Sequence, residues 1–184
     1  MSITVAIAGR PNVGKSTLFN RLIGQKRAIV NDEPGVTRDI LDSKVILHKN
    51  QFILLDTPGI NDNLSNDLEG RLRNNTIGSI NRADLIIFVF DAKVGVTNLD
   101  LSISKDIRKT NKSILLVANK CDVTKSKDNI IDSYKLGFGS PTLISAEHGT
   151  GIDELYNLIN KFLIDNNPSQ EYNSSNENES ILKL

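Results

Sequence analysis

The sequence contains no tryptophan and a single cysteine, Cys121, among its 184 residues. One cysteine excludes an internal disulfide and is typical of a protein kept in a reducing compartment. The longest fully apolar run covers residues 85–90, which is far too short to cross a bilayer. The N-terminus has no basic region followed by an apolar core, so we expect no signal peptide. These absences favour a cytoplasmic globular protein with no membrane partner.

An excess of charge of one sign is also missing, because 22 Lys and Arg residues balance 22 Asp and Glu residues. A neutral total does not indicate a nucleic acid or a membrane surface as partner. Lys105, Arg108, Lys109 and Lys112 form a local basic cluster that could contact RNA, although a solvated helix face explains it more simply. The length fits one domain with a sizeable core.

Residues 9–16 read Gly-Arg-Pro-Asn-Val-Gly-Lys-Ser, which is the spacing of a phosphate-binding P-loop. An apolar run at 3–8 precedes this loop, and apolar residues at helical spacing follow it as far as Gly24. In a strand–loop–helix context, successive backbone N–H groups and the helix N-terminus point at an anion. Lys15 is then expected to neutralise the outer phosphates and the Ser16 hydroxyl to bind Mg²⁺. The motif predicts a nucleoside phosphate as ligand.

Strands and helices alternate through the rest of the chain. The further predicted strands cover residues 40–47, 52–55, 83–91, 113–118 and 142–144, and the predicted helices cover 71–82, 99–109, 128–136 and 152–163. This alternation predicts a doubly wound α/β sheet with ligand loops at the carboxyl ends of the strands. Residues 49–51 form a tight connection between two predicted strands, so one strand is expected to run antiparallel in a mostly parallel sheet.

The sequence Asn-Lys-Cys-Asp at 119–122 predicts which base is bound. A carboxylate at Asp122 can accept hydrogen bonds from the N1–H and the amino group of guanine, whereas adenine would leave it unpaired. The stem of Lys120 can lie along the purine, and Asn119 can brace the loops around the nucleotide. Backbone N–H groups near residues 145–146 can donate to guanine O6. We therefore expect GTP or GDP as the ligand.

The sequence Asp-Thr-Pro-Gly follows a predicted strand and supplies a second set of candidate contacts. Asp56 can hold Mg²⁺ through water, and the Gly59 N–H can bond a γ-phosphate. Thr37 lies in the irregular loop 25–39 and could complete the Mg²⁺ shell in the triphosphate state, although a threonine after Pro-Gly-Val is also an ordinary turn residue. Contacts made only to a triphosphate would turn the two loops into a switch.

Taken together, these motifs resemble the Era-like branch of the translation-factor class of GTPases. The resemblance is carried by residues 9–22, 34–39, 56–60, 119–122 and 145–152. Within that branch the chain is most similar to the N-terminal G domain of the Der (EngA) family of ribosome-assembly GTPases. The resemblance implies a P-loop NTPase sheet like that of the small GTPases and GTP hydrolysis with Mg²⁺ as a conformational switch. It also implies the large ribosomal subunit as a partner.

The residues expected to act on the nucleotide come from several separate segments. Those expected to bind it are Gly9, Arg10, Pro11, Asn12, Val13, Gly14, Lys15, Ser16, Thr17, Asp56, Thr57, Gly59, Asn119, Lys120, Asp122, Ser145 and Ala146. The catalytic residues expected are Asn12, Lys15, Thr37 and Gly59, and the metal ligands expected are Ser16, Thr37 and Asp56.

The C-terminal part of the chain changes in composition. We expect residues 1–164 to form the G domain, 165–180 an acidic flexible linker and 181–184 the first strand of a second G domain. A frayed tail is the alternative for the last segment. The family resembled has two G domains followed by a KH-like domain, so we expect this chain to be a fragment that lacks the second G domain and the KH-like domain.

Ile60 stands where small regulatory GTPases usually carry a glutamine that orients water. We therefore expect slow intrinsic hydrolysis. In related potassium-dependent GTPases a P-loop asparagine coordinates a K⁺ ion, and Asn12 has that motif position; stabilising the loop turn is its alternative role. Three other readings stay open: a binding module with negligible turnover, an ATP-dependent phosphotransferase and the G domain of a tRNA-modification GTPase.

Overall fold

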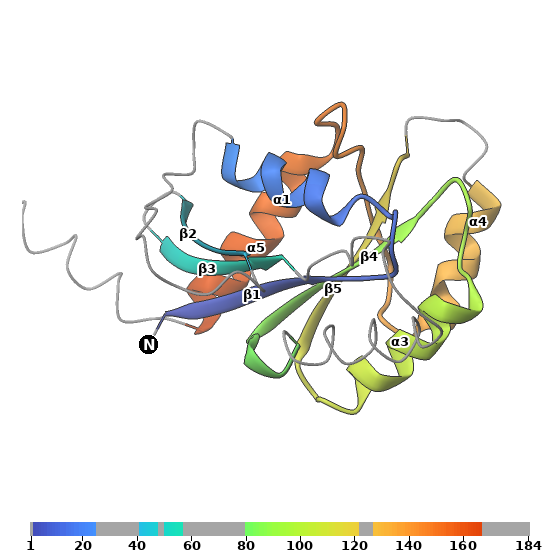
Figure 1. The fold of residues 1–184 in the computed structure, drawn as a ribbon, viewed down its shortest axis with the longest axis horizontal. Helices are drawn as coiled ribbons and strands as arrows, with labels where there is room; N and C mark the ends of the chain where they lie inside the picture. Colours follow the sequence, from blue (N-terminus) through green and yellow to red (C-terminus); the bar gives the residue numbers. More distant parts are fainter. Residues whose placement is uncertain (1, 25–40, 48–49, 57–79, 122–126, 167–184) are drawn as a thin grey trace, which may run out of the picture.

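The computed structural model describes residues 2–24, 41–47, 50–56, 80–121 and 127–166. Within these ranges, six strands form one sheet in the order β2-β3-β1-β4-β5-β6 (Figure 1). In chain order the elements are β1 (Ile3–Ala8), α1 (Lys15–Gly24), β2 (Leu41–Leu47), β3 (Asn50–Asp56), β4 (Leu85–Asp91), α3 (Asn98–Arg108), β5 (Ser113–Asn119), α4 (Lys127–Asp132), the 3₁₀ helix η2 (Ser133–Leu136), β6 (Thr142–Leu143) and α5 (Ile152–Asn166). None of the helices in these ranges combines the length and hydropathy that a membrane span requires.

The strand pairing confirms the predicted mixed sheet. β1 pairs in parallel with β3 and β4, and β5 pairs in parallel with β4 and β6. β2 alone runs antiparallel to its neighbour β3, with Leu47 opposite Asn50. The hairpin connection is therefore 48–49 and shorter than predicted, because Asn50 and Gln51 belong to β3. The amide of Asn50 donates to Asn160 Oδ1 of α5 at 2.9 Å, a polar strand start that hydrophobic patterning does not reveal.

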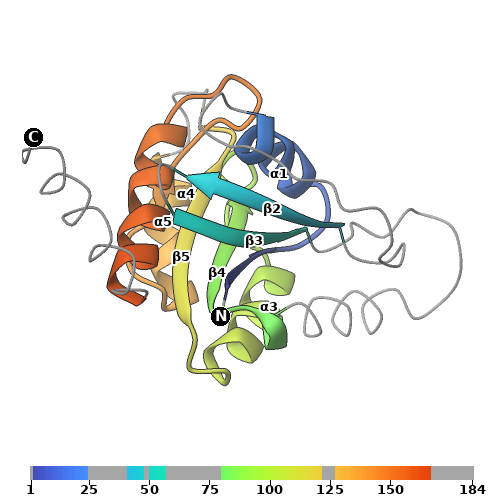
Figure 2. The ribbon, with the colours of Figure 1, turned by 90° about the vertical axis from the view of Figure 1, so that its left-hand side faces the viewer.

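Helices cover both faces of the sheet, α1 and α5 on one side and α3 with η2 on the other (Figures 1 and 2). Successive strand residues point to opposite faces. Val5 and Ile7 of β1 accordingly join the core under α1 and α5, whereas Ala6 and Ala8 join the core under α3. Every residue of β4 is buried, as expected for a central strand covered on both faces.

The predicted helices agree with the structure in place but not always in their bounds, and α3 (Asn98–Arg108) begins and ends one residue earlier than predicted. The predicted helix at 128–136 is divided into α4 and η2, and η2 ends at Leu136, followed by Gly137 with φ of 77°. Of the predicted helix at 71–82, the structure describes only the last three residues, which are helical. α5 extends to Asn166, whose amide donates to the Phe162 carbonyl at 2.9 Å, so helix continues past the predicted domain boundary at 164. The rest of the predicted linker lies outside the described residues.

Tyr156 joins the two helices on the first face. Its ring is fully buried, and its hydroxyl donates to the Leu22 carbonyl in the last turn of α1. Carbonyls in the last turn of a helix have no partner within the helix. The phenol therefore supplies both apolar packing and a buried hydrogen bond to the last turn of α1.

We expect Tyr156→Phe to lower the free energy of unfolding by roughly 1–3 kcal/mol, because it removes a buried hydrogen bond to the Leu22 carbonyl. Urea denaturation followed by circular dichroism measures this change. Tyr134→Phe is the matched control, since the Tyr134 hydroxyl lies on the surface against Ser140 Oγ. Its effect should stay within about 0.5 kcal/mol. Equal effects of the two substitutions would contradict the assignment.

Candidate functional site

The P-loop connects β1 to α1 at the carboxyl edge of the sheet. Gly9 and Gly14 have φ values of 150° and 93°, which favour glycine. A Cβ on Gly9 would lie 2.3 Å from the Val89 carbonyl oxygen, and one on Gly14 would lie 2.3 Å from Asn119 Nδ2. Both glycines are therefore required by close packing as well as by backbone conformation. The Leu18 N–H donates to the Gly14 carbonyl at 2.9 Å, which starts the helix directly after the loop.

Lys15 is only 7% exposed, although it carries a charge. Its Nζ donates to the Arg10 carbonyl at 2.9 Å, across the loop. Burial lowers the pKa of Lys15, and the Arg10 guanidinium adds to this effect, whereas Asp56 and Asp100 oppose it. An anion held by the loop would favour the charged ammonium, so the electrostatics of the loop suit a phosphate ligand.

Asp56 ends β3 beside the P-loop and is 3% exposed. Its Oδ1 has no hydrogen-bond partner in the part of the chain that the structure describes. Burial raises the pKa of this carboxyl, while the Ser16 hydroxyl and the Lys15 ammonium act to lower it. A buried carboxylate oxygen without a partner, next to a hydroxyl, is a donor set that suits Mg²⁺. These residues therefore fit the predicted magnesium ion.

Asn119 ties two of the predicted loops together. Its Nδ2 donates to the Val13 carbonyl at 2.8 Å, and its Oδ1 accepts from the Ala146 N–H at 2.9 Å. The side chain is almost fully buried, with 2% of its surface exposed. The structure thus brings the P-loop and the 145–151 loop together through one amide, which is the bracing contact predicted for this residue.

Lys120 follows Asn119 and adopts the left-handed conformation, with φ of 67°. Its Nζ donates to the Asn12 carbonyl at 2.8 Å and to Asp91 Oδ2 at 2.6 Å. Asn12 is also left-handed, with φ of 63°, and its side chain is exposed. Three segments therefore meet at the ammonium of Lys120: the P-loop, the end of β4 and the end of β5.

The loop at 145–151 is held by hydrogen bonds within itself and by the side chains of Asn119 and Arg21. The Ser145 N–H donates to the Thr150 carbonyl at 2.9 Å, and the Ala146 N–H is engaged by Asn119. Donation from Ala146 to guanine O6 would require this N–H to be shared, and that role stays a prediction. Arg21 of α1 binds the loop from the other side, with Nε 2.9 Å from the Ala146 carbonyl oxygen and an Nη2 bond to the Glu147 carbonyl.

Other predicted residues are either exposed or outside the described ranges. Ser16 and Thr17 lie exposed in the first turn of α1. Thr37, Thr57, Gly59, Ile60 and Asp122 lie outside the described residues. Their roles stay predictions.

Three charged residues of the site escaped the sequence analysis: Asp91, Asp100 and Arg21. Asp100 is fully buried, forms a capping box with Thr97 at the start of α3 and accepts from Arg10 Nε at 3.3 Å. The Thr97-x-x-Asp100 spacing is a helix-start signal that could have placed this carboxylate. Asp91 could have been noticed as the charged end of an apolar strand, whereas no pattern marks Arg21.

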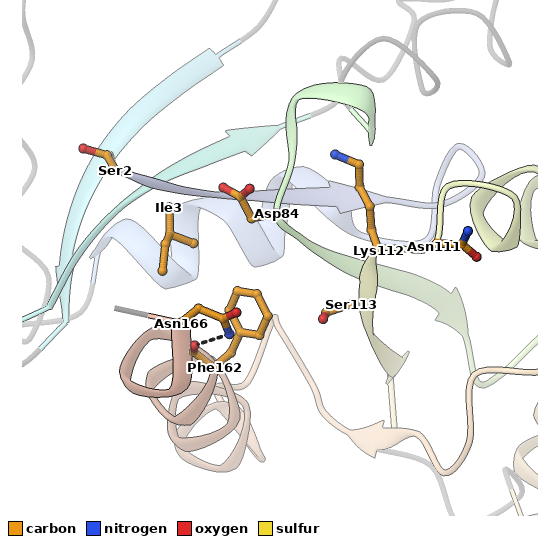
Figure 3. A pocket seen from close by; sticks show the side chains of 8 residues that line it. All are labelled: Ser2, Ile3, Asp84, Asn111, Lys112, Ser113, Phe162 and Asn166. Carbon is orange, nitrogen blue, oxygen red and sulfur yellow. Dashed lines mark hydrogen bonds between the residues drawn. The ribbon is translucent and has the colours of Figure 1, made fainter. Parts of the chain in front are cut away.

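A pocket of about 440 Å³ lies at the opposite edge of the sheet (Figure 3). It is formed by the amino ends of β1 and β5 and the end of α5. Its lining residues are Ser2, Ile3, Asp84, Asn111, Lys112, Ser113, Phe162 and Asn166. None of the predicted site residues belongs to it, so this pocket is separate from the candidate site.

Solved structures of GTPases share this fold. A point variant of Aquifex aeolicus Era, crystallised with GDP and AlF4⁻, is similar with a TM-score of 0.68 and 35% identity. The match covers 89% of this chain and 57% of the Era chain. Era in complex with MgGDPNP and a segment of 16S ribosomal RNA is similar with a TM-score of 0.69, the same identity and the same coverage. These matches confirm the predicted small-GTPase-like sheet.

Curated relatives point to one group of GTPases. The chain is 50% identical over 161 residues to GTPase Der of Bartonella henselae and 45% identical over 159 residues to GTPase Der of Jannaschia sp.. The two alignments cover 88% and 86% of this chain but 34% and 33% of the relatives, so the chain spans about a third of their length. A family model described as 50S ribosome-binding GTPase matches residues 4–120, more than half of the chain. The chain therefore belongs to the family of 50S ribosome-binding GTPases and, within it, is similar to a G domain of the Der proteins.

Proposed function

We propose that this chain is a conformational switch that binds GTP with Mg²⁺. It hydrolyses the bond between the β- and γ-phosphates and releases GDP and phosphate. The observation that carries this proposal is the double hydrogen bond of Asn119, to Val13 at 2.8 Å and to Ala146 at 2.9 Å. It places a P-loop, which recognises phosphate, against the loops whose sequence predicts guanine.

Each group of residues has a separate task in this proposal. The P-loop backbone surrounds the phosphates, and Lys15 exchanges its bond to the Arg10 carbonyl for the outer phosphates. Ser16 and Asp56 would hold Mg²⁺, which neutralises charge on the phosphates when it is bound. Asp122 reads the base. Thr37 and Gly59 sense the γ-phosphate.

Ile60 has no polar group that could orient the attacking water, so we propose a slow intrinsic rate of hydrolysis. We further propose that a K⁺ ion stabilises the negative charge of the transition state. Asn12 supports this role because its side chain is exposed at the loop. Its backbone carbonyl accepts from Lys120 at 2.8 Å, and the exposed side-chain amide adds a further oxygen that suits a cation. The same geometry allows the alternative, in which Asn12 only stabilises the turn.

The process served by this switch is proposed from the family. Ribosome binding in the family description and the similarity to Der support a role in assembly of the large ribosomal subunit, which implies a cytoplasmic location. Because the chain spans a third of its Der relatives, we also propose that it works with a second G domain and a KH-like domain. In this proposal residues 1–164 act as the G domain, and 165–180 and 181–184 form the linker and the start of the next domain.

Displacement of a fluorescent GDP analogue tests the choice of base. GTP should compete about 10⁴-fold better than ATP, because adenine leaves the Asp122 carboxylate without donors. Asp122→Ala should weaken GDP binding by at least about a hundredfold, since two charge-assisted hydrogen bonds are lost. Asp132→Ala is the matched control, because Asp132 is exposed and pairs with Lys135 on the surface. Equal competition by ATP and GTP would instead favour the ATP-dependent phosphotransferase.

GTP turnover with Mg²⁺, in potassium chloride and in sodium chloride at equal ionic strength, tests the potassium proposal. We expect the rate in potassium to be higher by about tenfold or more, the scale of one electrostatic stabiliser of the transition state. Asn12→Ala should abolish the difference, while Asn157→Ala on the exposed face of α5 should retain it. Near-zero rates in both salts, with GDP still bound, would support the binding module.

A further inference from the structure

We propose that Asp91 is a positioning residue for guanine nucleotide binding, which fixes the side chain of Lys120 before the nucleotide arrives. The inference rests on the proposed function, since Lys120 is expected to lie along the purine. No motif of the sequence assigns a role to Asp91, which is the last residue of β4.

Asp91 is held in place by backbone N–H groups of the turn that follows it. Its Oδ1 accepts from the N–H groups of Lys93 at 2.8 Å and Val94 at 3.3 Å, and its backbone carbonyl accepts from Gly95 at 2.9 Å. The next residue, Ala92, donates its N–H to the Asn119 carbonyl at 2.9 Å. The carboxylate therefore has a fixed position relative to both β4 and β5. Oδ2 is the atom that remains for Lys120.

Lys120 is the flexible partner of the pair. Its four-carbon stem can lose up to about 2 kcal/mol of rotamer freedom when it is ordered. The bond to Asp91 Oδ2 at 2.6 Å and the bond to the Asn12 carbonyl at 2.8 Å hold the ammonium from two sides. The stem is thus ordered in the protein alone. Ordering a side chain before binding reduces the entropy lost when the ligand binds.

The burial of Asp91 makes this pair more costly to break than an ordinary surface ion pair. The Asp91 side chain is 5% exposed and that of Lys120 is 35% exposed. Burial opposes ionisation of Asp91, but its bonds to Lys120, Lys93 and Val94 outweigh burial and hold the pKa of this carboxyl below its usual range. The carboxylate is therefore charged at neutral pH. A buried charge that loses its partner is costly, so the pair stays formed.

The two oxygens of Asp91 allow a selective test. Asp91→Asn keeps its one side-chain oxygen for the N–H groups of Lys93 and Val94, and its amide NH₂ group, a donor, then faces the Lys120 ammonium. If Asp91 acts through Lys120, its substitution should matter only while the ammonium is present. A double-mutant cycle with Lys120→Met, which keeps an unbranched apolar stem, measures that dependence.

The experiment is titration of the whole 184-residue chain with a fluorescent GDP analogue, for the wild type, Asp91→Asn, Lys120→Met and the double variant. We expect Asp91→Asn to weaken binding about tenfold in the wild-type background, the scale of one charge-assisted hydrogen bond. In the Lys120→Met background the further loss should be less than about twofold. A residue that only supported the fold would cause the same loss in both backgrounds, and that result would overturn the inference.

Controls separate this inference from the proposed function. Asp84→Asn is the matched substitution, because Asp84 accepts from the Thr4 N–H at 2.8 Å at the opposite edge of the sheet, and it should leave GDP affinity unchanged. If Asp91→Asn does not fold, Asp91→Ser, whose hydroxyl can still accept from the loop, takes its place in the cycle. A wild-type chain that binds no GDP overturns the proposed function and this inference with it. Tight wild-type binding with equal losses in both backgrounds overturns the role of Asp91 alone.

Discussion

The geometry of the candidate site depends on the buried amide of Asn119. Its two hydrogen bonds reach Val13, which lies 106 residues away in the sequence, and Ala146, which lies 27 residues away. Because water does not reach these groups, losing the amide would leave a carbonyl and an N–H unpaired inside the protein. The amide also lies so close to Gly14 that no side chain fits there. The P-loop and the loop at 145–151 are therefore held in one fixed relation.

Around this amide, charges are paired between loops rather than within them. Arg10 of the P-loop meets Asp100 at the start of α3, and Lys120 meets Asp91 at the end of β4. The P-loop lysine is different, because burial disfavours its charged form more strongly than the Asp56 and Asp100 carboxylates favour it. Burial likewise disfavours the charged form of Asp56, which is the carboxylate. A ligand that brings phosphate together with a cation removes both penalties at once.

The sheet and the loop at its edge could be predicted because their signals are local. A run such as residues 3–8 followed by glycines and a helix depends on neighbours in the sequence, and the Asn119 brace follows from a motif with a fixed place in that frame. The contacts of Asp91, Asp100 and Arg21 could not be predicted in the same way. They join segments that only the folded sheet brings together. Hydrophobic periodicity does not indicate which charged residues pair with each other. The start of β3 was misplaced for a related reason, since Asn50 is a polar residue whose partner lies on α5.

The largest difference between the pocket and the candidate site lies in their polar groups and not in their volume. The pocket of about 440 Å³ at the amino ends of the strands has room for a small molecule. Its charged groups, however, are already engaged: Lys112 donates to the carbonyls of Asn81 and Ala83, and Asp84 accepts from Thr4. At the carboxyl edge, Asp56 instead keeps a buried oxygen without a partner among the described residues. The charged groups that line the pocket are therefore hydrogen-bonded in the folded chain, whereas the carboxyl edge keeps a buried oxygen with a desolvation cost. Binding of a ligand can remove that cost.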